Sequence, residues 1–133
     1  MATFASLQDA REFFIRDRFA SENGMTLEAL TEDGAVCAMA LTGRHQNAEG
    51  GVMGGAILAL ADFTFAVAAN NAHRPSVAQQ MSLNFLNASK GKKLVSTASC
   101  IKNGRTSCVY LIEIKDDLGG DIARAMFTGF KLA

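Results

Sequence analysis

The stretch 45–71, H-Q-N-A-E-G-G-V-M-G-G-A-I-L-A-L-A-D-F-T-F-A-V-A-A-N-N, decides the fold of this chain. Its first part is a loop rich in glycine and asparagine. From about Met53 to Asn70 it predicts a long helix that is apolar on nearly every side, which is typical of a buried helix. Inside that helix Asp62 is the one carboxylate, and Thr64 is the other polar side chain before Asn70. Because a buried, unpaired carboxylate is costly, Asp62 is expected to have either a partner or a chemical role.

Periodicity and turn residues on both sides of this stretch predict one further helix and six strands. Residues 6–20 fit an amphipathic helix, with Ser6 as its N-cap and Asn23-Gly24 as its stop. The predicted strands cover residues 26–31, 35–41, 77–86, 94–102, 106–115 and 121–132. Strands grouped around one very apolar helix indicate an α+β fold. We expect an antiparallel sheet wrapped around the long helix, with the last four strands forming a meander.

Length and charge limit the class of protein. A chain of 133 residues predicts one domain, 1–133. A net charge of zero argues against a general nucleic-acid binder. We see no secretory leader pattern, and we expect the apolar run to be too short to span a bilayer and to be interrupted by Asp62. The expectation is therefore a cytoplasmic protein without a nucleic-acid or membrane partner.

Cysteines and histidines give no metal signature. Cys37, Cys100 and Cys108 lie far apart and lack C-x-x-C spacing, which fits free thiols in a reducing compartment. The two histidines, His45 and His73, show no ligand spacing with Cys or Asp. We expect neither a metal nor a cofactor.

The start of the long helix is a candidate oxyanion site. Gly54 and Gly55 fall in its first turn, where backbone N–H groups lack partners within the helix. Such donors can stabilise a carbonyl oxygen that gains negative charge, although the two glycines could instead serve tight helix–sheet packing. Asp62 is the candidate general base or nucleophile, or else a buried carboxylate that bonds a loop backbone. Asn47 could position water or the substrate, or hold its own loop by an Asx turn.

The spacing of these residues predicts a site shared between two chains. Gly54 and Asp62 are eight residues apart, about 12 Å along a helix axis at 1.5 Å per residue. The two residues of one chain cannot contact the same reacting carbonyl, because such contacts need a distance of about 3 Å. A two-fold dimer with the long helices side by side and antiparallel would bring Gly54 of one chain to Asp62 of the other. We therefore predict two composite sites per homodimer.

At these residues the chain resembles the hot-dog-fold acyl-CoA thioesterases of the phenylacetate-degradation type. The family pattern N-x-x-G-x-x-H-G-G-x-x-x-x-L-x-D reads here N47-A-E-G50-G-V-M53-G54-G55-A-I-L-A-L60-A-D62. The similarity extends through 77–86, the N-G-R-T hairpin at 103–106 and the closing strand. It implies hydrolysis of a small or medium acyl-CoA thioester, aromatic acyl groups included. Asp62 would be base or nucleophile, Gly54 N–H the oxyanion donor and Asn47 the orienting residue, in interface sites of a homodimer or of a tetramer built from dimers.

One departure from the pattern concerns Met53, which stands where the family usually has His. Met cannot donate a hydrogen bond, so a weakened or retuned thioesterase is expected, and Met53 could instead widen the pocket for an apolar acyl group. The alternative is a non-catalytic acyl-CoA-binding module on the same fold. A hot-dog dehydratase ranks low, because the histidines flank the long helix. The remaining residues assigned to substrate binding are Gly55, Ala78, Gln79, Arg105 and Thr106, with Arg105 as the leading candidate for a phosphate contact.

Overall fold

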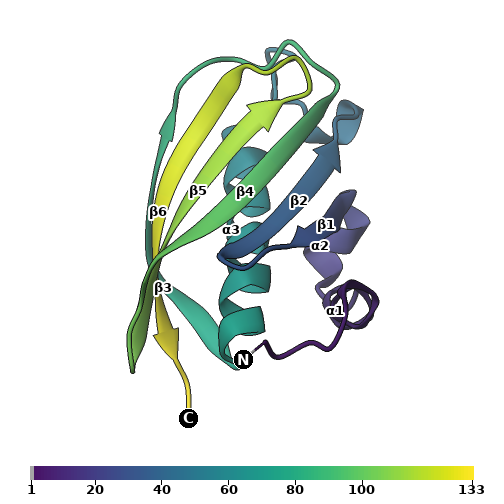
Figure 1. The fold of residues 1–133 in the computed structure, drawn as a ribbon. Coiled ribbons are helices and arrows are strands. Elements are labelled where there is room, and N and C mark those ends of the chain that lie inside the picture. Colours follow the sequence, from purple (N-terminus) through teal and green to yellow (C-terminus); the bar gives the residue numbers. More distant parts are fainter. Residues whose placement is uncertain (1) are drawn as a thin grey trace.

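A six-stranded antiparallel sheet curves around one long helix in the computed structural model, which describes residues 2–133 (Figure 1). The elements in chain order are α1 (Leu7–Phe14), α2 (Arg18–Glu22), β1 (Met25–Leu30), β2 (Gly34–Ala40), the 3₁₀ turn η1 (Gly43–His45), α3 (Gly54–Ala72), β3 (Ser76–Phe85), β4 (Lys93–Asn103), β5 (Ser107–Asp116) and β6 (Asp121–Lys131). The sheet order is β1-β2-β4-β5-β6-β3. The α+β architecture predicted from the sequence, a sheet around an apolar helix, is confirmed.

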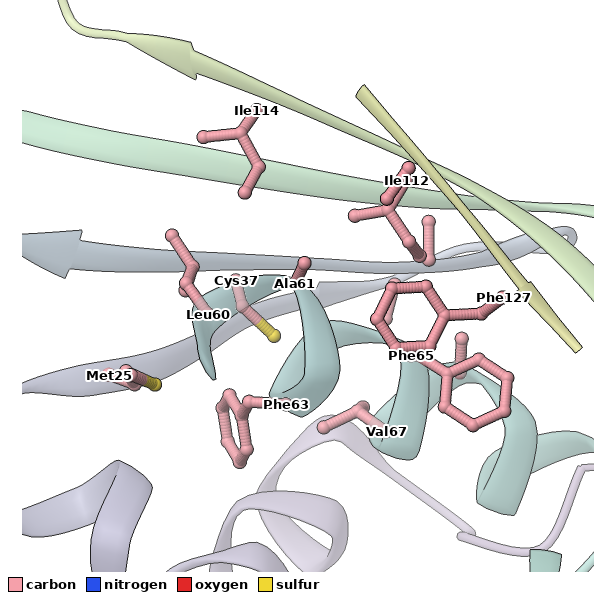
Figure 2. Packing of buried hydrophobic residues seen from close by; sticks show 14 of the residues in the cluster. Met25, Cys37, Leu60, Ala61, Phe63, Phe65, Val67, Ile112, Ile114 and Phe127 are labelled. Carbon is pink, nitrogen blue, oxygen red and sulfur yellow. The ribbon is translucent and has the colours of Figure 1, made fainter. Parts of the chain in front are cut away.

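Helix α3 fills the hollow of the sheet. Leu60, Phe65 and Val67 are fully buried, and the ring of Phe65 stacks on Phe127 of β6 at 5.1 Å between centroids (Figure 2). By length and composition alone α3 could cross a bilayer, so the expectation that this run is too short is wrong. Its packing inside the sheet accounts for its apolar character, since about half of it, 56% of the most apolar window, is buried in the fold.

The N-terminal segment forms two helices instead of the single predicted helix. Ser6 is the N-cap, and its Oγ accepts a hydrogen bond from Asp9 N at 3.1 Å. The helix ends after Phe14, and α2 begins at Arg18. Phe14 and Ala20 are both buried. They are six residues apart, so in one continuous helix of 3.6 residues per turn they would point in very different directions. The break allows both side chains to be buried.

The strand order corrects the predicted four-strand meander. Strands β4, β5 and β6 do pair in succession, but β3 pairs with β6, and β4 pairs with β2. Helix α3 carries the chain across the sheet to its far edge, where β3 runs back beside the helix (Figure 1). Strand β3 is largely exposed on both faces, as an edge strand with one partner would be. The order of the strands in the sequence therefore does not predict that β3 pairs with β6 and β4 with β2.

Candidate functional site

A cavity of about 450 Å³ opens at the N-terminus of α3. Two residues predicted for the site, Asn47 and Gly54, lie in its wall. The other lining residues come from the preceding loop, from α3 and from the end of β3: Gly51, Val52, Ile57, Phe85, Leu86, Asn87, Ala88 and Ser89. The fold thus brings the glycine-rich loop and the helix start to one concave surface.

The first turn of α3 carries unpaired donors beside this cavity. Met53 is the N-cap, and its side chain makes no capping hydrogen bond. Within residues 2–133, the backbone N–H groups of Gly54 and Gly55 have no hydrogen-bond acceptor. These donors, together with the positive end of the helix dipole, can bind an oxygen that becomes negative. The Met53 side chain is 55% exposed, so the position that departs from the family pattern lies at the surface of the single chain.

Phe85 explains why a glycine stands at position 54. A Cβ added to Gly54 would lie 3.0 Å from Cζ of Phe85 and 3.4 Å from its Cε1. The ring is 58% exposed and lies over the helix start, at the end of β3. Sequence reasoning did not select Phe85 for the site. No sequence signal marks it, because a single exposed aromatic residue is common on protein surfaces.

Asn47 holds its own loop. Its side-chain Oδ1 accepts hydrogen bonds from Glu49 N and Gly51 N, both at 3.0 Å. Of the two roles left open by the sequence, the Asx-type loop role is therefore present. The amide nitrogen of Asn47 makes no hydrogen bond within the described residues, so it can still donate to a substrate or a water.

His45 also anchors this loop. It is 4% exposed, Thr42 N donates to its Nδ1 at 3.1 Å, and its Nε2 lies 2.8 Å from Asn23 O. A carbonyl oxygen can only accept, so Nε2 carries the proton and Nδ1 is the acceptor. Met53 N in turn donates to His45 O at 2.8 Å. Both ring nitrogens are occupied by structural bonds, which leaves this imidazole no free atom for acid–base chemistry.

Asp62 lies in the middle of α3 on a stripe that the chain itself leaves uncovered. The residues of this stripe that are exposed or half-buried follow the helical repeat: Gly55, Ala59, Asp62 and Ala66. Asp62 itself is exposed, so the buried environment expected for it is incomplete in one copy of the chain. Its apolar neighbours Ala61 and Phe63 point into the fold and are buried. Partial desolvation by the surrounding helix raises the pKa of Asp62, and the negative charge of Asp17 raises it further.

The distance between the two candidate groups follows from the continuity of α3. Helix α3 runs unbroken from Gly54 to Ala72, so Gly54 and Asp62 are separated by about 12 Å along the axis. One chain therefore does not bring its own Gly54 N–H and its own Asp62 carboxylate to the same reacting atom.

The remaining predicted residues lie toward the opposite end of α3. Ala78 and Gln79 follow the start of β3, about 20 Å along that strand from Phe85 at 3.3 Å per residue. Arg105 and Thr106 form the β4–β5 turn, where Thr106 O accepts from Lys131 N at 2.9 Å. Within one chain these four residues do not meet the cavity at Gly54.

Asn70 fixes the connection between α3 and β3. Its Oδ1 accepts from Ser76 N at 2.8 Å, and its Nδ2 donates to Ala66 O at 2.8 Å. As for metals, no group of three or more His, Cys, Asp or Glu side chains in residues 2–133 could hold an ion.

Comparison with known protein families places these features in one family. The model of the thioesterase superfamily matches residues 49–123, a segment that contains Gly54, Asp62 and strands β3 to β5. The chain belongs to the thioesterase superfamily. The matched segment begins just after Asn47 and includes the whole of α3.

Two individual relatives of this thioesterase-superfamily chain are presumed esterases. A presumed esterase of Deinococcus radiodurans is 33% identical over 112 residues, which are 84% of this chain and 75% of that protein. A presumed esterase of Archaeoglobus fulgidus is 33% identical over 95 residues, 71% of this chain and 62% of that protein. The chain thus spans about three fifths of the length of the Archaeoglobus relative.

Solved structures show the same fold. The Escherichia coli PaaI protein from the phenylacetic acid degradation operon superimposes with a TM-score of 0.88 at 27% identity, covering 95% of this chain and 92% of that one. A mutant of the phenylacetic acid degradation protein PaaI from Thermus thermophilus gives a TM-score of 0.80 at 26% identity, covering 86% and 98%. The hot-dog fold expected from the sequence is therefore confirmed.

Proposed function

We propose that this protein hydrolyses acyl-CoA thioesters to a free acid and CoA, in active sites shared between two copies of the chain. The observation that carries the proposal is the pairing of two features on α3. Gly54, with an unpaired N–H donor, lines a cavity at the helix start, and the exposed Asp62 lies about 12 Å away along the axis. Membership of the thioesterase superfamily supports this class of chemistry.

The proposed reaction uses the Gly54 N–H and the Asp62 carboxylate together. The thioester oxygen accepts a hydrogen bond from Gly54 N–H, and the carboxylate of Asp62 removes a proton from a water that attacks the carbonyl carbon. The C–S bond then breaks, and the departing CoA thiolate takes up the proton held by Asp62. A raised pKa makes Asp62 a stronger base than an ordinary aspartate. Direct attack by the carboxylate, followed by hydrolysis of the anhydride, is the second form of the same proposal.

Two uncovered surfaces support a homodimer. The α3 stripe around Asp62 consists of small side chains, and the adjacent strand β3 has a free edge. Antiparallel packing of two α3 helices would cover the stripe and place Gly54 of one copy against Asp62 of the other. A tetramer built from two such dimers is an extension of this arrangement.

The same packing accounts for residues that one chain keeps apart. Past Asp62, α3 continues for ten residues, about 15 Å, to Ala72. In the antiparallel pair this part of the second copy would extend beyond the Gly54 cavity of the first. It would bring the β4–β5 turn with Arg105 and Thr106, and the start of β3 with Ala78 and Gln79, toward the cavity mouth. Arg105 remains our candidate for a CoA phosphate contact.

A thiol-release assay on a panel of acyl-CoA esters tests the proposal. We expect hydrolysis by the wild type and a loss of at least about 100-fold in kcat/KM for Asp62→Ala. Asp9→Ala, which removes an exposed carboxylate on α1, serves as the matched control and should retain wild-type activity. Binding of acyl-CoA with no turnover in the wild type would refute hydrolysis and favour a binding module.

Met53 gives a specific reason to keep the binding module as a second candidate. At the N-cap of α3 it supplies no donor, where the family pattern has a histidine. A Met53→His variant tests this position, because an added donor near the carbonyl should raise kcat. An unchanged kcat would show that the helix N–H groups suffice.

We also propose a cytoplasmic location. Cys37 and Cys108 are buried, Cys100 is half-buried, and all three are free thiols, as expected in a reducing compartment.

A further inference from the structure

A second cavity, of about 490 Å³, lies between the N-terminal helices and the sheet. Its volume is within the usual range for small-molecule sites. Four buried apolar side chains from α1, β1 and α3 line it: Phe14, Met25, Leu27 and Phe63. The catalytic scheme proposed above makes no use of this cavity.

The cavity is adjacent to Asp62 through two features. Phe63, which follows Asp62 in α3, lines it, and Figure 2 shows that ring pointing away from the sheet toward α1 and α2. On the other side, Ile15 lines the cavity while its side chain is 65% exposed, so it stands at the rim. Ile15 begins the α1–α2 connection, and Asp17 in that connection is near enough to Asp62 to raise its pKa. Phe63 on α3 and the α1–α2 connection thus place the cavity next to Asp62.

The polar groups of the cavity are already engaged. Arg11 Nε donates to Leu27 O at 2.7 Å, and Arg11 forms an ion pair with Glu28 at 3.7 Å. These bonds tie α1 to β1 and hold the wall in place, and they leave the interior apolar. An apolar ligand therefore fits this space better than a charged one.

We infer that this cavity holds the distal part of a medium-chain acyl group whose thioester reacts at Asp62, with Ile15 at the entrance. The inference rests on the proposed acyl-CoA function and adds the acyl length, which the N-terminal cavity of α3 does not define. Each methylene buried in an apolar cavity adds about fourfold to affinity, so the protein should prefer extended acyl groups over acetyl.

Non-hydrolysable thioethers test acyl length without relying on turnover. The affinities of S-ethyl-CoA and S-decyl-CoA would be measured by titration calorimetry for the wild type, Thr26→Phe and Ile15→Trp. Thr26 lines the cavity from β1 with an exposed side chain, so a phenyl ring there would fill the space without disturbing the core. Ile101→Trp is the matched control, since Ile101 is similarly exposed at 58% and belongs to β4.

We expect S-decyl-CoA to bind the wild type and Ile101→Trp at least about tenfold more tightly than S-ethyl-CoA. In Thr26→Phe and Ile15→Trp this ratio should fall to about threefold or less, while the affinity for S-ethyl-CoA stays within about twofold. A decyl preference that persists in both variants, or is absent from the wild type, would overturn the inference. If the wild type prefers S-decyl-CoA, both variants lose that preference, and the wild type never turns over acyl-CoA, the cavity assignment stands and hydrolysis alone is refuted.

Discussion

Mixing two inactive variants should restore hydrolysis, and the amount restored follows from the geometry of α3. Asp62→Ala removes the carboxylate, and Gly54→Leu fills the space where even a Cβ would lie 3.0 Å from Phe85. Because about 12 Å of helix separates the two positions, each active site needs Gly54 from one copy and Asp62 from the other. Random re-association of equal amounts gives about half heterodimers, each with one intact site of two. The mixture should therefore show about a quarter of wild-type activity.

The assay is thiol release from acyl-CoA after the two variants are dissociated together and refolded. The control mixes wild type with the double variant Asp62→Ala/Gly54→Leu. Shared sites leave only wild-type homodimers active, about a quarter of the full activity, whereas sites within one chain would leave about half. Zero recovery in the first mixture together with half activity in the control would refute the shared site.

Three further predictions concern pH and packing. Asp62→Asn should remove activity and raise the melting temperature at pH 7. The pKa of Asp62 is raised in the folded protein, so the stability of the wild type falls as the pH rises from about 3.8 through that raised pKa. At pH 3 the melting temperatures of the wild type and the variant should coincide. Asp116 behaves oppositely, since the N–H of Gly120 and further hydrogen bonds lower its pKa. Its contribution to stability should be present at pH 7 and be lost as the pH falls below about 4. In urea unfolding, Asp116→Asn should therefore be less stable than the wild type at pH 7 and equally stable in acid. Gly129→Ala should destabilise the fold by about 1–3 kcal/mol in urea unfolding, because the new Cβ would lie 2.6 Å from Phe65 Cζ, and wild-type stability in this variant would contradict the packing.

Local signals predicted the strands well. The strand 121–132 was expected and runs Asp121–Lys131, and 106–115 was expected and runs Ser107–Asp116. Period-two alternation and glycine turns are properties of neighbouring residues, so one sequence suffices to read them. The partner of β3 was missed for the opposite reason. Pairing with β6 depends on where α3 delivers the chain, which is a property of the whole fold.

Part of the geometry of the candidate site could be predicted from the sequence, and its surroundings less so. Gly54 and Asn47 do line one cavity, as their loop and helix-start positions suggested. The exposure of Asp62 was not predictable from neighbours, because the apolar residues on either side of it face the core while it does not. Phe85 was missed because it lies about thirty residues after Gly54 in the sequence, and only the fold brings its ring over Gly54.

The apolar character of α3 has two different causes, and their separation is the strongest physical reason to expect a second copy of the chain. Most of the helix is apolar because it packs inside the sheet. The stripe through Gly55, Ala59, Asp62 and Ala66 is only partly covered by its own chain, yet apart from the carboxylate it bears only small side chains. Small residues let two helix axes approach toward the lower end of the usual range, about 8 Å. In the dimer that we propose, the backbone N–H groups of the neighbouring helix start would come within reach of the carboxylate at that distance, and the same contact would complete its desolvation.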